Sequence, residues 1–184
     1  VVPRLAMEAD WAAGEALDVI SIAQAPLLVR YPALVALATL RVRRGDPSAE
    51  PLLDEMTRLL EKGKELQRLA PYAALMAERA WLGQADRGEA LALIDLAESL
   101  SPTRAMFGEL ACWRQLLVPG CEPSDTAGMA IPHRLQLAGD WRGAAAFWAE
   151  MQAPFEQALA LVRGDEAALR LALEIFESLN ARPV

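Results

Sequence analysis

The chain has 184 residues, of which 54% are hydrophobic and 23% are charged, and this composition excludes a wholly disordered protein. The formal net charge of −7 argues against nucleic-acid binding by this segment itself. The longest apolar stretch, residues 27–40, is interrupted by Arg30 and Pro32 and is too short to span a bilayer. Cys112 and Cys121 fit neither a disulfide framework nor a zinc spacing, so we expect a reducing, cytoplasmic environment.

Hydrophobic residues recur with a helical period along the whole chain, and no run alternates as a strand would. A glycine followed by an acidic or capping residue recurs at Gly14-Glu15, Gly45-Asp46, Gly83 to Asp86, Gly139-Asp140 and Gly164-Asp165. Because such a glycine ends one helix and the next side chain caps the following one, these turns predict antiparallel helical hairpins. We expect helices over residues 3–13, 16–24, 27–44, 48–62, 66–82, 87–100, 104–117, 126–138, 141–151, 154–163 and 166–179.

Three of these turns are followed by the spacing of degenerate tetratricopeptide repeats, in which a small residue lets two helices touch and a bulky one packs on the next hairpin. The matching residues are Ala90, Ile94, Ala97 and Pro102; then Ala144, Trp148 and Met151; then Leu169, Leu173 and Phe176, where the small residue is lost. The sequence therefore predicts an all-α, right-handed superhelix of stacked antiparallel helical hairpins. It forms one domain over residues 1–184, with a possible internal break at the linker 118–126.

No catalytic or metal-binding motif is apparent. The single histidine, His133, stands near a predicted helix start, and we interpret it as an exposed first-turn side chain rather than a general base. The basic cluster of Arg41, Arg43 and Arg44 before Gly45 is interpreted as a complement to a helix C-terminus. Phosphate-binding loops, His-Glu-x-x-His and Cys-x-x-Cys are missing from the sequence. We therefore expect no enzymatic activity and no cofactor or metal in this segment.

Stacked hairpins form an extended concave groove, so we expect the chain to bind a ligand or partner there. Arginine and tyrosine suit recognition of a peptide or an anion, although an ordinary solvated face is the alternative for each residue. The candidates are Arg30, Arg68, Tyr72, Arg79, Glu109, Arg114 and Gln136. Trp113 is the tryptophan considered for this surface, with core packing as the alternative, and Trp11 and Trp81 are expected to cap seams between helices.

Several stretches occur in a familiar succession. Gly45-Asp-Pro, Lys64–Pro71 and Ala77–Gly83 come first, Gly108-Glu-Leu-Ala-Cys-Trp113 follows, and His133–Arg142, Pro154–Ala160, Gly164–Arg170 and Phe176–Pro183 come last. Together they resemble the helical-repeat region of large bacterial LuxR-type transcriptional regulators. The resemblance covers residues 40–184, and it departs at Asn180, where glycine is often found, and at the linker 118–126.

Such regulators join an N-terminal ATPase, a central tetratricopeptide-like array and a C-terminal helix-turn-helix. The resemblance implies a cytoplasmic sensor and coupling region that binds a small-molecule effector or a protein partner. It implies contact with DNA only through a helix-turn-helix domain absent from this chain, and none with a membrane. The chain opens Val-Val-Pro and ends at Val184, and we expect it to be a segment of a larger protein. The alternative is a free-standing adaptor that binds a peptide segment of a partner protein.

Overall fold

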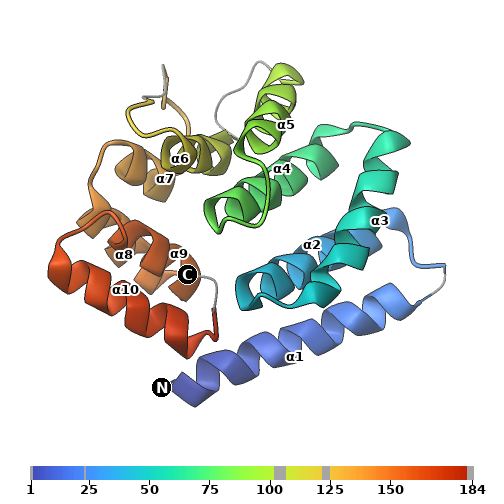
Figure 1. The fold of residues 1–184 in the computed structure, drawn as a ribbon, viewed down its shortest axis with the longest axis horizontal. Helices are drawn as coiled ribbons and strands as arrows, with labels where there is room; N and C mark the ends of the chain where they lie inside the picture. Colours follow the sequence, from blue (N-terminus) through green and yellow to red (C-terminus); the bar gives the residue numbers. More distant parts are fainter. Residues whose placement is uncertain (1, 23, 102–106, 122–124, 182–184) are drawn as a thin grey trace.

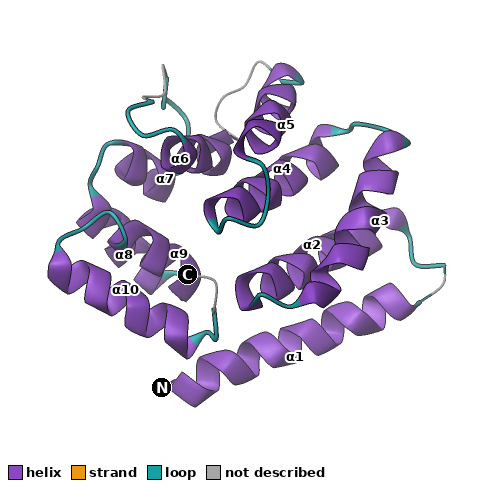
Figure 2. Cartoon of the chain, viewed as in Figure 1, coloured by secondary structure: helices purple, strands orange, loops and turns teal. Residues whose placement is uncertain are grey.

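The computed structural model describes residues 2–22, 24–101, 107–121 and 125–181, and these form helices without any strand (Figures 1 and 2). The prediction of an all-α fold is therefore confirmed. The helices are α1 (Val2–Ser21), α2 (Leu27–Arg44), the 3-10 turn η1 (Pro47–Ala49), α3 (Glu50–Glu61), α4 (Leu66–Trp81), α5 (Arg87–Ser99), α6 (Gly108–Leu117), α7 (Ile131–Leu137), α8 (Trp141–Glu150), α9 (Pro154–Leu161) and α10 (Glu166–Ser178).

Most helix boundaries lie where the glycine and aspartate signals placed them. Asp86, Asp140 and Asp165 each accept a hydrogen bond from the backbone N–H three residues further on, at 2.9, 2.9 and 3.1 Å. Gly45 ends α2 in the left-handed conformation, with φ of 65°, which glycine adopts without steric penalty. Asn180 has a φ of 58°, and asparagine tolerates this region better than most residues. It therefore substitutes for the expected glycine.

The hairpin predicted at Gly14 is wrong. α1 runs unbroken through this residue, and Ala16 on its inner face is buried. A glycine inside a helix costs only about 1 kcal/mol relative to alanine, which is less than α1 would lose by giving up its packing along α2. Trp11 is 70% exposed, so it caps no seam between helices.

The helices follow one another round the molecule, and α10 returns to contact α1 (Figure 1). Consecutive helices pack against each other, as α1 does on α2, α4 on α5 and α8 on α9. One apolar core extends through most of this array, from Ala16 to Ala181. A smaller cluster of Ala111, Met129 and Leu137 joins α6 to α7 across the linker 118–126. Within the part of the chain that is described, no helix has the length and apolarity needed to cross a membrane.

In α5 the residues that match the repeat spacing all face the core. Ala90, Ile94 and Ala97 are fully buried, as small and bulky residues at these positions should be. Ala144 in α8 is likewise buried, whereas Met151 at the end of that pattern is 62% exposed. Pro102 lies outside the described residues.

The same spacing fails in α10. Leu169 and Leu173 are 46% and 51% exposed, so they do not pack on a neighbouring hairpin. The buried face is instead formed by residues at i, i+4 and i+8, which share one side of a helix: Ala168, Ala172 and Phe176. The buried face of α10 thus begins one position before the one that the repeat spacing predicted.

Candidate functional site

A cavity of about 280 Å³ lies between the end of α2 and helices α6, α7, α8 and α9. Its volume is near the lower limit for small-molecule sites. The lining combines charged, aromatic and apolar side chains: Arg43, Glu109, Cys112, Trp113, Leu116, His133, Gln136, Trp148, Glu156 and Leu159.

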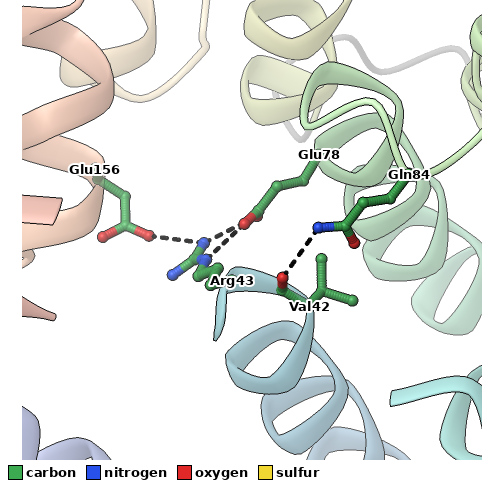
Figure 3. Close-up of polar contacts among 5 residues, drawn as sticks. All are labelled: Val42, Arg43, Glu78, Gln84 and Glu156. Atoms are coloured by element: carbon green, nitrogen blue, oxygen red, sulfur yellow. Dashed lines mark hydrogen bonds and ion pairs between the residues drawn. The ribbon is translucent and has the colours of Figure 1, made fainter. Parts of the chain in front are cut away.

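Arg43, in the last turn of α2, joins three helices at this cavity (Figure 3). Its guanidinium donates from Nε and Nη2 to the two carboxylate oxygens of Glu78 on α4, at 2.7 and 3.0 Å. Nη2 also lies 3.6 Å from Oε1 of Glu156 on α9. The guanidinium carbon stands 3.4 Å from the ring centroid of Phe155, close enough for a cation–π interaction. Burial alone would lower the pKa of Arg43, but the charge and hydrogen bonds of Glu78, with Glu156 and Glu109, raise it.

Two features of the local sequence end α2 just after Arg43. Gly45 ends the helix immediately afterwards, and Asp46 accepts from the backbone N–H of Ser48 at 2.8 Å to start η1. The Nε2 of Gln84 donates to the carbonyl of Val42 at 3.3 Å, a second hydrogen bond to an oxygen that already accepts from the backbone N–H of Gly45 at 3.0 Å (Figure 3). The end of α2 is therefore anchored on the connection between α4 and α5.

Glu109 stands in the first turn of α6 and lines the cavity. Its side chain is reached by solvent, yet protein surrounds the carboxyl group on most sides, and this desolvation raises its pKa. A hydrogen bond with the Trp113 side chain and the charge of Arg43 oppose that shift, while the carboxylate of Glu156 adds to it. Among the described residues, no cation forms an ion pair with Glu109.

The expectation that His133 is an exposed first-turn residue is wrong. Its ring is half-buried and lies 5.6 Å from that of Trp148, centroid to centroid. The cause is Gly108, because a Cβ there would stand 2.6 Å from Nδ1 of His133. The absence of a side chain lets the start of α7 pack over the start of α6. Burial lowers the pKa of His133, so the imidazole is neutral near pH 7.

The chemistry of the cavity favours binding over reaction. Burial raises the pKa of the Cys112 thiol to about 12, and its Sγ lies 3.7 Å from the carbonyl oxygen of His133. A thiol with such a pKa stays protonated and is a poor nucleophile. The buried indole N–H of Trp148 has no acceptor in the described structure. No group of three or more His, Cys, Asp and Glu side chains suited to a metal ion occurs within the described ranges.

Three of the residues predicted to form a binding surface do lie together in this cavity: Glu109, Trp113 and Gln136. Trp113 fits both the core-packing and the binding-surface interpretations, since it is only 4% exposed and also lines the cavity. Its ring packs against that of Trp81, with centroids 6.2 Å apart.

The predicted arginines lie elsewhere, and each is paired with a carboxylate. None of them lines this cavity. The ion pairs are Arg30 with Glu55 at 2.8 Å, Arg68 with Glu65 at 3.0 Å, Arg79 with Glu50 at 2.6 Å, and Arg114 with Asp95 and Glu98 at 2.6 and 3.3 Å.

Tyr72 lines a second hollow, an apolar groove of about 450 Å³ between α3, α4 and α5. Its hydroxyl lies 2.8 Å from Oγ1 of Thr57, and the residue is 9% exposed. Leu60, Leu93 and Leu96 form much of the remaining wall. This groove is separate from the cavity at Arg43.

Sequence reasoning missed Arg43, Glu156, Trp148 and Cys112 as parts of one site. Arg43 was interpreted together with Arg41 and Arg44 as a complement to the helix dipole, and all three do occupy the last turn of α2. Only the tertiary fold distinguishes them, because Arg43 meets a carboxylate 35 residues further along the chain.

No family model matches this chain, and no curated protein or solved structure shows significant similarity to it. The chain is an array of packed helices with a small polar and aromatic cavity, and Arg43 in the wall of this cavity forms ion pairs with two other helices.

Proposed function

We propose that this chain is the sensor and coupling region of an ATP-dependent LuxR-type transcriptional regulator and that its effector binds in the cavity at Arg43. In this proposal the helices are degenerate tetratricopeptide-like hairpins of a right-handed superhelix, working in the cytoplasm without catalysing a reaction. DNA is contacted only by a helix-turn-helix domain outside this chain. The observation that carries the proposal is the position of Arg43, which joins α2, α4 and α9 at the wall of the cavity.

Arg43 gives a ligand in the cavity a way to act on distant helices. Arg43 and Glu156 line both this cavity and a second one of about 270 Å³ beside Phe155 and Leu179. A ligand that engages Glu156 competes with its 3.6 Å contact to Arg43 and so changes the connection between α2 and α9. Coupling follows if the ligand binds one arrangement of these helices more tightly than the other.

We propose that the cavity catalyses no reaction because its thiol and its imidazole are not arranged as a nucleophile and a base. Cys112 is held as a thiol, and His133 is flanked by the aromatic ring of Trp148. A nucleophile needs a base that activates it, and the raised pKa of Cys112 argues against such a pair here.

The test uses the native polypeptide. We expect a Gly-x-x-x-x-Gly-Lys-Ser/Thr loop before this region, a helix-turn-helix after it, and self-association that depends on ATP. Glu156→Gln should shift the ATP concentration needed for self-association, whereas Glu174→Gln on the exposed face of α10 should not. A native polypeptide with neither flanking domain would remove the regulator proposal.

That outcome would leave the second candidate, an adaptor that binds a peptide segment of a partner. The apolar groove at Tyr72 favours it, because leucine and methionine side chains line it and Lys64, Glu61 and Glu89 stand at its edges. Apolar peptide side chains with charged neighbours fit such a surface. Leu93→Asp should abolish peptide binding there without affecting a ligand in the Arg43 cavity.

A further inference from the structure

We propose that the ligand of the Arg43 cavity is a small organic cation, an amine or a guanidinium, held between the carboxylates of Glu109 and Glu156 and against the rings of Trp113 and Trp148. This inference rests on the proposed function, because it names the ligand class of the same cavity. Charge, aromatic lining and size each contribute to the argument.

Negative charge exceeds positive charge around the cavity. The carboxylates of Glu78, Glu156 and Glu109 all act on the single guanidinium of Arg43. Arg43 already donates two hydrogen bonds to Glu78, and the ring of Phe155 packs against one face of its guanidinium. An anionic ligand would therefore have to displace a two-point carboxylate contact. A cation instead meets Glu156, whose contact to Arg43 is single and 3.6 Å long, and Glu109, which pairs with no cation among the described residues.

Glu109 and Glu156 repel each other across the lining. The charge of Glu156 disfavours ionisation of Glu109, and the nearby charge of Arg43 opposes this only in part. Arg163 is exposed and donates to the side-chain oxygen of Gln115 at 2.6 Å, outside the lining. A ligand cation between the two carboxylates removes this repulsion and gives Glu109 an ion pair, which no cation among the described residues provides.

The aromatic residues suit the same ligand. Trp113 on α6 and Trp148 on α8 both line the cavity, and indole rings are the strongest cation–π partners among side chains. His133 contributes a neutral ring beside Trp148, because burial lowers its pKa. A volume of about 280 Å³ limits the ligand to the size of one small ring with a short substituent.

The experiment compares three probes that share a phenyl ring and differ in charge: benzylamine, benzyl alcohol and benzoate. Binding to the folded chain is measured by tryptophan fluorescence and by calorimetry. We expect benzylamine to bind about tenfold more tightly than benzyl alcohol, and benzoate to bind more weakly than either. Glu109→Gln should remove the preference for the amine, and Glu156→Gln should reduce it. The control Glu174→Gln removes the same charge from an exposed position on α10 and should change nothing.

The outcomes separate this inference from the proposed function. Tighter binding of benzoate or benzyl alcohol, abolished when Cys112→Trp fills the cavity, overturns the cation and keeps an effector site. An amine preference that survives in both Glu109→Gln and Glu156→Gln also overturns it. No binding by any of the three probes overturns the effector cavity itself. Circular dichroism on each variant checks that its helices are retained, as we expect for a replacement of the exposed Glu109.

Discussion

Replacing Arg43 with methionine tests whether its ion pairs hold the array together. The change removes both hydrogen bonds to Glu78 and leaves that carboxylate, whose side chain is 4% exposed, without its partner. Breaking a buried ion pair from one side costs roughly 3–5 kcal/mol. The Arg43 side chain is 22% exposed, and methionine keeps an apolar contact with Phe155, so we expect a loss of about 3 kcal/mol.

The companion variants give an ordered series. Glu156→Gln should cost less than about 1 kcal/mol, because its contact to Arg43 is 3.6 Å long and its side chain is 36% exposed. The double variant Arg43→Met with Glu78→Leu should recover most of the loss, since neither charge remains without a partner. Urea denaturation followed by tryptophan fluorescence measures each free energy of unfolding, and an unchanged m-value shows that the same structure unfolds.

Two results would refute this reasoning. If the double variant is as unstable as Arg43→Met alone, the loss comes from packing and not from the unpaired Glu78 carboxylate. If Glu156→Gln is as destabilising as Arg43→Met, the contact to α9 rather than that to α4 carries the interaction. In either case the description of Arg43 as an electrostatic junction of three helices would have to be withdrawn.

Three further predictions concern packing and pH. Gly108→Ala should lower the free energy of unfolding by roughly 1–3 kcal/mol through its clash with His133, whereas Gly14→Ala, in open space within α1, should raise it by about 0.5–1 kcal/mol in the same urea assay. Ile94→Ala should cost roughly 2–5 kcal/mol at a fully buried site, and Leu173→Ala at an exposed site less than about 0.5 kcal/mol; equal losses would contradict the burial pattern. Burial lowers the pKa of His133 in the folded chain, so the unfolded chain binds more protons as the pH falls through 6.5. The free energy of unfolding should therefore decrease from pH 6.5 down to the pKa of the folded chain. His133→Gln should flatten that part of a plot of stability against pH.

The sequence predicted the elements of the fold well because their signals are local. Asp86, Asp140 and Asp165 each cap the helix that was expected to start beside them, through a bond spanning three residues. At Gly14 the same glycine-acid signal led to a wrong prediction. The segments on both sides of Gly14 belong to α1, which packs on α2 as one helix, and this packing outweighs the local tendency to turn. Leu169 misled for a related reason, since a displacement of one position changes which face of a helix is buried.

The site was predicted less well because its members come together only in the tertiary structure. Glu109 and Trp113 were predicted as site residues from one short stretch of sequence, which forms the single helix α6. Arg68, Arg79 and Arg114 have the same residue type as Arg43 and also lie on helices, yet they pair with carboxylates away from the cavity. No spacing in the sequence records which acidic residue each arginine meets.

Arg43 differs from these three arginines in what its ion pairs connect. Arg79 and Arg114 each bridge a helix to one neighbouring in sequence, as in α3 to α4 and α5 to α6. Arg43 instead links α2 to α9, which are separated by most of the chain and are drawn close as the array returns on itself to place α10 against α1. A local pair stabilises one step of the array, whereas a pair that connects distant steps responds to any change in their separation. For that reason the proposed function assigns the coupling of a bound ligand to the wall of the cavity and not to the other ion pairs.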